Sequence, residues 1–498
     1  MAAQRRGRIE NVTDYEELLA GQIGTRAVGS VSSASLPCMG SPRVPVILVQ
    51  FADTKFSIAE TDEDIHALYD NFFNAPAGIN PGQKGYESYC SVREYFSIQS
   101  AGQFTPEFTI IGPVTLSDSY RYYGEDNGSL KDIHINDFYS EACKLAVANY
   151  DIDWSIFDNK DKGTVSFAFF IYAGRGQNDN NDDPYTIWPK ESSSSKKVTY
   201  GDTSVTFAAF GCTCELFKEG QDGIGTIIHE IGHGLGLPDF YDIYYEAFGM
   251  DIWDIMDSGC YQMIGSWPCN MTAYEREFMG WSKIQPLAAD TVCTLVLDPI
   301  SEGGMAYKII NPANADEYLI LENRQNTGLD TYLGCLNFSL AERYGPAHGL
   351  LVTHVDYLAS SWTSNRVNTS VSHQRMTIVP ADDELISNCV YGYTTLWASS
   401  LSGDLYPGSK ATTELTSYAA FKGGAFDITV DNIRETPEGK IYVDINGGSP
   451  TSIVDTEETS APDTYVQIYT PDGRPVSTLR KGINIVRTQS GTIKKIKN

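Results

Sequence analysis

The chain has 498 residues, of which 42% are apolar, and a formal net charge of −28. This length exceeds what one hydrophobic core usually serves, so we expect two or three domains. The strong negative charge argues against nucleic acids and anionic membrane surfaces as partners. No apolar run approaches the length of a transmembrane segment.

The first 285 residues mix strand and helix signals. Residues 1–39 are polar and weakly periodic, which is typical of a pro-segment remnant or a linker, and the start at Met1 lacks the apolar core of a signal peptide. From residue 40 onward, apolar β-branched runs predict buried strands at 44–51 and 165–173. Predicted helices follow at 62–75, 132–150, 222–236 and 271–279. Residues 40–285 are therefore expected to form an α+β domain.

The helix predicted at 222–236 carries the most informative motif, His229-Glu230-Ile231-Gly232-His233. Residues four apart share one face of a helix, so His229 and His233 can both reach one metal ion. Glu230 follows the first ligand directly and can act as general base on metal-activated water. A chance match to this motif is expected in roughly one such chain in a hundred or less. The motif predicts a catalytic zinc site.

Four residues around this motif predict unusual backbone. Gly232 and Gly234 lie inside the helix, where each costs about 0.8–1 kcal/mol relative to alanine. Two such costs beside the histidines indicate that glycine is needed here for another reason, such as the close approach of a neighbouring segment. Gly236 is placed to end the helix in a left-handed conformation, and Pro238 prevents its continuation.

The turn after the helix can bring a third protein ligand to the metal. Three protein ligands leave an open position, which distinguishes a catalytic zinc site from a structural one. Asp239 holds the expected spacing and is favoured, with Asp242 and Glu246 as nearby alternatives. If Asp239 is the ligand, Asp242 would orient one of the metal ligands without binding the metal itself, or it would cap a helix.

The segment beyond the turn adds two candidates. Its sequence, Trp253-Asp254-Ile255-Met256-Asp257-Ser258-Gly259, resembles the Met-turn of metzincin-type peptidases, in which a Met forms an apolar floor beneath the ligand imidazoles. Met256 is thus expected under the site. A hydrolytic site also needs a group that stabilises the oxyanion. Tyr261 is a candidate for this role, although a packing role is the simpler interpretation in a chain with 30 Tyr.

After Trp281 the pattern changes to alternating strands and turns. Few helix signals occur, and we predict an all-β, sandwich-like companion domain at 286–447. A Gly/Ser/Pro stretch followed by acidic residues predicts a linker at 448–462. Residues 463–498 are expected to form a small β module that is too short to fold robustly alone.

The combination of motifs resembles the immune inhibitor A family of secreted zinc metallopeptidases, in its Bacteroidetes-type form. The specific part is the zinc motif with its extension Leu237-Pro238-Asp239-Phe240-Tyr241-Asp242. The resemblance covers roughly residues 40–450. Further matching stretches lie at 43–51, 91–96, 186–189, 273–276 with 280–281, and 349–356.

This resemblance implies a zincin, metzincin-like catalytic domain and zinc endopeptidase activity on protein or peptide substrates. It implies His229, His233 and Asp239 as zinc ligands and Glu230 as the base. It further implies a secreted or cell-surface protein made as a zymogen, with its signal peptide removed, although cytoplasmic residence is the alternative. We expect a monomer with no transmembrane segment. The C-terminal module resembles modules that serve in sorting or anchoring.

A second class of function stays open, that of a surface adhesin or binding protein with a vestigial zincin domain. In that case the β domains would carry the function. The intact Glu230 beside two intact ligands argues against this hypothesis, since loss of the base is the usual first sign of decay. The enzyme is therefore the favoured interpretation.

Other metals have weaker candidates. The acidic loop at 158–163 carries Lys160 and Lys162 where calcium would need oxygen ligands, and an ammonium group cannot bind calcium. The Asn- and Asp-rich stretch at 178–183 is a better candidate for structural Ca²⁺, although a solvated turn is the favoured interpretation. A structural metal shared by His354, Asp356 and His373 is a further hypothesis.

The ten Cys form no paired Cys-x-x-Cys signature, so a cysteine-based zinc site is not expected. Cys260 and Cys269 bracket a short loop and could be joined. Cys212 and Cys214 are too close for an easy mutual bridge. Cys38 invites comparison with the cysteine switch of some metzincin zymogens, but its flanking residues do not match.

Overall fold

The computed structural model describes residues 34–448 except 129, 180–182, 219, 416–417, 419 and 424–425, together with the backbone of four strands beyond residue 464. The chain divides into two compact units, Met1–Ser452 and Ile453–Asn498. Most of the predicted linker at 448–462 and most of the predicted pro-segment at 1–39 lie outside the described residues. The domain boundaries therefore stay predictions.

In the second unit, four strands form an antiparallel sheet in the order β18-β17-β19-β20. They are β17 (Tyr465–Tyr469), β18 (Pro475–Val476), β19 (Ile483–Thr488) and β20 (Ile493–Lys497).

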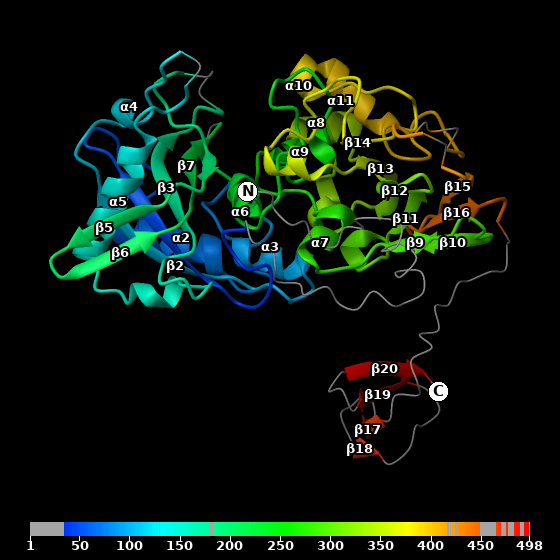
Figure 1. Ribbon diagram of the computed structural model, residues 1–498, viewed down its shortest axis with the longest axis horizontal. Helices are drawn as coiled ribbons and strands as arrows, with labels where there is room; N and C mark the ends of the chain where they lie inside the picture. Colours follow the sequence, from blue (N-terminus) through cyan, green and yellow to red (C-terminus); the bar gives the residue numbers. More distant parts are fainter. Residues whose placement is uncertain are drawn as a thin grey trace. The chain divides into compact units, whose positions relative to one another are not determined.

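A six-stranded sheet organises the first half of the larger unit, at the left of Figure 1. Its order is β2-β1-β3-β7-β4, with β8 paired to β7, and β2, β1, β3 and β7 run parallel. The edge strand β4 runs antiparallel to β7. The strands are β1 (Arg43–Gln50), β2 (Glu107–Thr115), β3 (Ala168–Arg175), β4 (Lys190–Ser192), β7 (Phe210–Phe217) and β8 (Gly220–Gln221).

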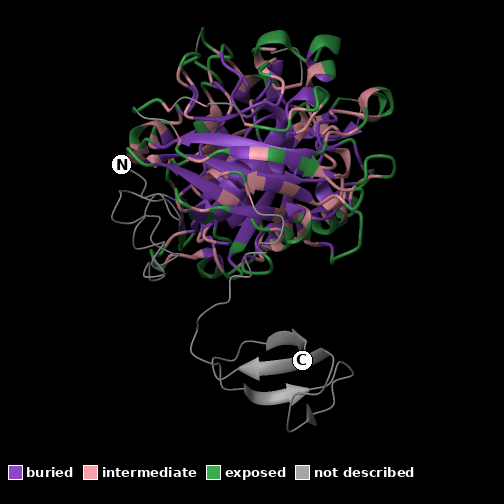
Figure 2. Cartoon of the chain, turned by 90° about the vertical axis from the view of Figure 1, so that its right-hand side faces the viewer, coloured by how far each residue is buried: buried purple, intermediate pink, exposed green. Residues whose placement is uncertain are grey.

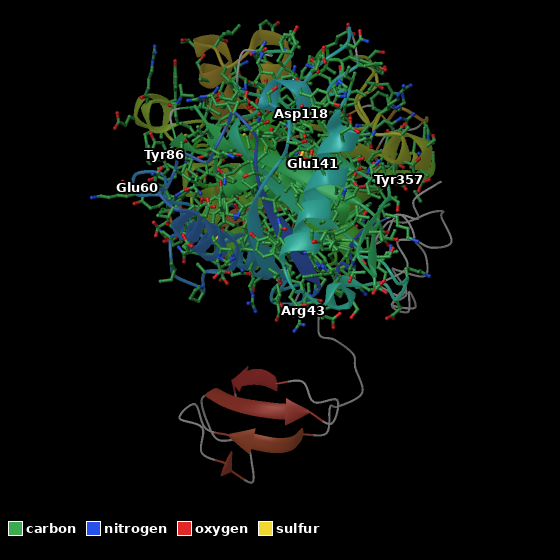
Figure 3. The ribbon with its side chains drawn as sticks, turned by 90° about the vertical axis from the view of Figure 1, so that its left-hand side faces the viewer. Arg43, Glu60, Tyr86, Asp118, Glu141 and Tyr357 are labelled. Carbon is green, nitrogen blue, oxygen red and sulfur yellow. The ribbon has the colours of Figure 1, made fainter. Side chains whose placement is uncertain are left out.

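Helices cover both faces of this sheet. Side chains alternate along a strand, so Val46 and Leu48 of β1 enter one core while Ile47 and Val49 enter another. The first core includes α2 (Asp62–Asn74), α3 (Val92–Gln99) and α6 (Ile224–Gly234), and the second includes α5 (Ile135–Asn149). Figure 3 shows α5 on the second face, with Glu141 labelled on it. Burial on both faces explains the apolar runs.

The remaining elements of this half are short. They are α4 (Tyr120–Tyr123), η1 (Trp154–Phe157), the hairpin β5 (Lys196–Tyr200) and β6 (Thr203–Phe207), η2 (Asp251–Trp253), η3 (Ser258–Tyr261) and α7 (Ala273–Met279). The predicted helices and strands are confirmed to within three residues at each boundary. In α7, for example, Thr272 and Glu275 form a capping box at the start, and Gly280 ends the helix at φ 78°.

Two sheets face one another in the second half, at the right of Figure 1. The first has the order β14-β13-β12-β11-β9 and the second β10-β16-β15. Leu319 and Val352 of the first share a core with Leu295 and Val443 of the second, which is a sandwich arrangement. Figure 2 shows these strands as largely buried. The strands are β9 (Gln285–Leu287), β10 (Cys293–Leu297), β11 (Tyr307–Asn311), β12 (Asn314–Arg324), β13 (Gly349–Asp356), β14 (Met376–Ile378), β15 (Val430–Glu435) and β16 (Ile441–Ile445).

The prediction of an all-β second half is wrong, because this half also contains four short helices. They are α8 (Phe338–Tyr344), α9 (Ala359–Thr363), α10 (Asn388–Tyr391) and α11 (Thr395–Ser400), beside the 3₁₀ turns η4 (Ile300–Glu302), η5 (Gly328–Tyr332) and η6 (Leu401–Gly403). The helices have at most seven residues, too few for a 3.6-residue periodicity to appear. Side chains of Asn337, Ser387 and Thr394 cap three of them instead.

One core connects the two halves. Trp253 and Met256 of the first half share a continuous buried cluster with Tyr318, Trp362 and Trp397 of the second. The hydrophobic interior therefore does not stop near residue 285. None of the described helices has the length and apolar character that crossing a bilayer requires.

Candidate metal centre

Helix α6 presents both motif histidines and ends as its glycines predict. After Gly234 the chain turns back, with the Leu237 amide donating to the Gly232 carbonyl at 3.0 Å and the Gly236 amide to the His233 carbonyl at 2.8 Å. Gly236 adopts φ 98°, the left-handed region that favours glycine. The predicted helix end is confirmed. The turn directs the following residues toward the histidines.

The glycines inside α6 meet close neighbours. A Cβ added at Gly232 would lie 2.6 Å from the Sδ atom of Met256, and one at Gly234 would lie 3.1 Å from the Phe167 ring. Met256 is fully buried against this helix. The predicted close approach is confirmed, and the Met-turn methionine lies against the turn of α6 between the two histidines.

Backbone carbonyl groups orient both imidazoles. His229 donates from Nδ1 to the Ile255 carbonyl at 3.0 Å, and His233 donates from Nδ1 to the Leu237 carbonyl at 2.9 Å. The two rings lie 4.8 Å apart at 88°. Because each Nδ1 donates to a carbonyl group, each Nε2 is the ring nitrogen left to bind a metal once it is deprotonated.

Asp239 completes a three-membered group with these nitrogens. Its Oδ1 atom lies 3.1 Å from the Nε2 of His229 and 3.1 Å from the Nε2 of His233. Two ligands bound at about 2.0 Å to a tetrahedral ion are roughly 3.3 Å apart, so this spacing fits one zinc ion. Asp239 Oδ1 is buried and has no hydrogen-bond partner. Within the described part of the chain, this is the group of three or more His, Cys, Asp or Glu residues that could hold an ion.

Electrostatic coupling within the group is strong. Burial opposes protonation of His233, but the negative charge of Asp239 outweighs it and raises the His233 pKa to about 10. For Asp239, burial likewise disfavours the charged form, yet the two histidines hold its pKa well below the usual value. A carboxylate this firmly ionised needs a nearby positive charge, which a proton or a metal ion can supply.

The alternative carboxylates do not join the group. Asp242 is buried, and its oxygens accept backbone amides of Tyr244, Glu246 and Ala247 at 3.0 Å. It therefore stabilises the following turn, while the Glu246 side chain is exposed.

Glu230 lies beside His229 and His233 at the wall of a cleft of about 660 Å³. Glu230 is only 5% exposed to solvent. Burial raises the pKa of the Glu230 carboxyl to about 7, with His229 and His233 opposing the shift. A carboxyl group with such a pKa can accept and return a proton near neutral pH.

Aromatic side chains line the same cleft. Tyr261 stacks on Phe217 at 5.4 Å between ring centroids, and its hydroxyl accepts a hydrogen bond from Asn178 Nδ2 at 3.4 Å. Burial raises its pKa well above 10, so the phenol stays a neutral donor. Tyr241 also lines the cleft, with its ring 6.5 Å from that of His229. The matching stretch at 237–242 contained Tyr241 but gave it no role.

Two cleft residues came with no sequence signal at all. Glu191 lies on the edge strand β4, and its place beside the zinc motif follows from the sheet order. Asn365 follows α9 in the second half and contacts Asp239. No local pattern connects either residue to α6, because both contacts depend on how distant segments pack.

The other metal hypotheses fare differently. His354 and His373 do not converge on a shared ion: His354 contacts Glu317 and Tyr418, while His373 contacts Asp356. That hypothesis is wrong, because both ring nitrogens of His354 and the Nε2 atom of His373 already have protein partners. In the loop at 158–163, backbone amides donate to Asp158. The calcium candidate at 178–183 lies partly outside the described residues.

Two cysteine hypotheses are not supported, whereas the expectation that Cys212 and Cys214 form no mutual bridge agrees with the structure. Cys260 and Cys269 are both thiols, so the bridge considered between them is not formed, and Cys212 and Cys214 are thiols as well. The Sγ atom of Cys38 lies 3.8 Å from the Leu235 carbonyl oxygen, and Cys38 is not among the residues that line the cleft.

Comparison with known proteins agrees with the geometry. Residues 182–283 match the family model described as immune inhibitor A peptidase M6, catalytic domain. Immune inhibitor A of Bacillus thuringiensis subsp. alesti is 28% identical over 280 residues, covering 47% of this chain and 39% of that protein. The pre-pro-metalloprotease PrtV of Vibrio cholerae serotype O1 is 23% identical over 274 residues, covering 48% of this chain and 29% of that protein.

The matched region thus spans well under two thirds of either relative. These matches do not test the Bacteroidetes-type form. The matched segment, residues 182–283, contains α6, the turn to Asp239 and the Met-turn. Residues 182–283 are thus similar to the catalytic domain of the immune inhibitor A family of metallopeptidases, peptidase M6.

Proposed function

We propose that the protein is a zinc-dependent endopeptidase, in which His229, His233 and Asp239 hold the metal and Glu230 is the general base. The observation that carries the proposal is the buried Asp239 Oδ1 atom, which lies 3.1 Å from two imidazole nitrogens and has no hydrogen-bond partner. A buried oxygen without a hydrogen bond is costly, and a cation between the three atoms would remove that cost.

The chemistry divides between the metal and the chain. When bound, zinc would supply a Lewis acid that polarises the scissile carbonyl and acidifies water. Glu230 would take the proton of the attacking water at its carboxylate and pass it to the leaving amine. Tyr261 is the candidate hydrogen-bond donor to the developing oxyanion, since its neutral phenol lines the cleft.

The cleft suits an extended polypeptide. Lys190 and Glu191 of the edge strand β4 line it, and β4 pairs with β7 on one side only in the described sheet. An extended chain can add to such an edge through backbone hydrogen bonds, which are independent of side-chain identity. This supports protein or peptide substrates. The name pre-pro-metalloprotease of the Vibrio relative supports export and processing of this chain as well.

The Glu230→Gln variant tests this proposal. Glutamine keeps the shape of the side chain but cannot accept the proton, so we expect casein hydrolysis to fall by about 10²–10⁴-fold with bound zinc unchanged. A chelator should abolish hydrolysis by the wild type, and added zinc should restore it. Wild-type protein that purifies without zinc and binds none on addition would contradict the proposal. That result would favour the vestigial binding protein.

A further inference from the structure

Asn365 forms a two-point contact with Asp239 across 126 residues of sequence. The Asp239 backbone amide donates to Asn365 Oδ1 at 2.7 Å, and Asn365 Nδ2 donates to Asp239 Oδ2 at 2.5 Å. Asn365 follows α9 and lies outside the segment 182–283 that the family model matches.

This contact distinguishes the two oxygens of Asp239. Oδ2 is held by the Asn365 amide, whereas Oδ1 faces both imidazole nitrogens. A carboxylate whose second oxygen is occupied binds an ion through one oxygen only. Monodentate binding by Asp239 leaves the position that water and substrate need at a catalytic zinc.

The backbone conformation and the neighbouring hydrogen bonds hold Asn365 in place for this contact. Asn365 adopts φ 55°, the left-handed region that Asn and Asp tolerate better than other non-glycine residues. Nearby, the fully buried Asn368 donates through Nδ2 to the carbonyls of Phe240 at 2.7 Å and Met376 at 2.6 Å. The loop is therefore fixed to the Asp239–Phe240 segment at two successive points.

We propose that Asn365 is a positioning residue of the metal centre, which holds Asp239 as a monodentate ligand through the Nδ2–Oδ2 hydrogen bond. The inference rests on the proposed zinc site. It assigns part of that site to the second half of the large unit, because ligand geometry depends on groups that hold the ligands.

The test compares zinc affinity in Asn365→Asp and wild type by competition with a chromogenic chelator. Aspartate keeps the shape, the left-handed backbone and the acceptor for the Asp239 amide, but it directs a carboxylate oxygen at Asp239 Oδ2. We expect zinc to bind about 10–100-fold more weakly. Ser364→Ala is the matched control, because Ser364 is the exposed neighbour and is expected to bind zinc as the wild type does.

A second variant reports on coordination directly. Asn365→Gly tolerates the left-handed backbone and frees Asp239 Oδ2 to become a second metal contact. With Co²⁺ in place of zinc, we expect the visible absorption to weaken, as it does when coordination number rises. A purely structural role of Asn365 would change the melting temperature of the metal-free protein and leave this spectrum unaltered.

The outcomes separate the two proposals. Unchanged zinc affinity in Asn365→Asp together with an unchanged Co²⁺ spectrum in Asn365→Gly would overturn the positioning role alone. A wild type that binds neither ion would overturn the zinc site itself. Weaker zinc binding in Asn365→Asp with an altered spectrum in Asn365→Gly supports the proposal.

Discussion

Two of the histidine and carboxylate groups in the described part of the chain differ in where their atoms point. In the first half, the Nε2 atoms of His229 and His233 converge on one oxygen of Asp239 that has no hydrogen-bond partner. In the second half, His354 is held between Glu317 and the Tyr418 hydroxyl, each at 3.0 Å. Both groups combine the same residue types, and all their members except the half-buried His233 are buried.

The difference shows what separates a metal site from a structural histidine. At His354 both ring nitrogens have protein partners, and three further donors satisfy Glu317: the Phe421 and Lys422 amides and Asn311. At the zinc motif, carbonyl groups accept hydrogen bonds from the Nδ1 atoms, and both Nε2 atoms lie 3.1 Å from one carboxylate oxygen. Complete pairing stabilises a fold, whereas convergence without complete pairing leaves room for a cation.

The largest expected effect separates the two groups by metal content. His233→Ala removes one of three ligands, so we expect zinc retained after dialysis to fall from one ion per chain to none. His373→Ala is the control, since its partner Asp356 keeps Arg375 and Lys422. Elemental analysis of the dialysed proteins measures both. Retention of zinc by His233→Ala would contradict the claim that the first group holds the metal.

Removing His354 should affect stability and leave the metal in place. His354→Leu removes one hydrogen-bond donor from the buried Glu317 carboxylate, which costs about 1.5–3 kcal/mol of unfolding free energy. Urea unfolding of the metal-free protein measures this loss. The double variant His354→Leu with Glu317→Leu should recover part of it, because no unpaired charge remains. Zinc content should match the wild type.

Acid should weaken the same group in a defined pH range. Burial tends to raise the Glu317 pKa, but hydrogen bonds from His354, the Phe421 amide and Asn311 outweigh it and lower the pKa from 4.5 to about 2. A lowered folded-state pKa stabilises above the unfolded value and is lost as pH falls toward the folded value.

This contribution amounts to about 3 kcal/mol, which should disappear between pH 4.5 and about pH 2. Unfolding free energies of wild type and Glu317→Gln across that range test it. The variant should show a shallower decline with acid, and parallel curves would show that Glu317 does not contribute.

The smallest expected effect concerns how the zinc helix contacts the Met-turn. The Cβ in Gly232→Ala would lie 2.6 Å from Met256 Sδ, so Met256 must move, at a cost of about 1–3 kcal/mol. Adding Met256→Ala should make the glycine substitution much less costly, because the clashing sulfur is gone. Thermal unfolding of the four proteins of this cycle measures the coupling, and additive effects would argue against direct contact.

Much of the fold could be predicted because its signals are local. A few turns of helical periodicity or one short apolar run are enough to predict three elements, which are the helix at 222–236, the strand at 44–51 and the helix at 271–279. The four short helices of the second half could not be found in this way. Their formation depends on single capping residues and on the surface against which they pack.

The candidate site likewise combines features that local sequence determines with features that only the tertiary structure decides. The spacing of His229 and His233, the base between them and the glycine turn before Asp239 are properties of consecutive residues, so the sequence alone determined them. Tertiary structure decided that Met256 packs against Gly232, that Glu191 enters the cleft, and that Asn365 holds Asp239. These contacts join segments up to 126 residues apart, and a local pattern carries no information about which distant surfaces meet.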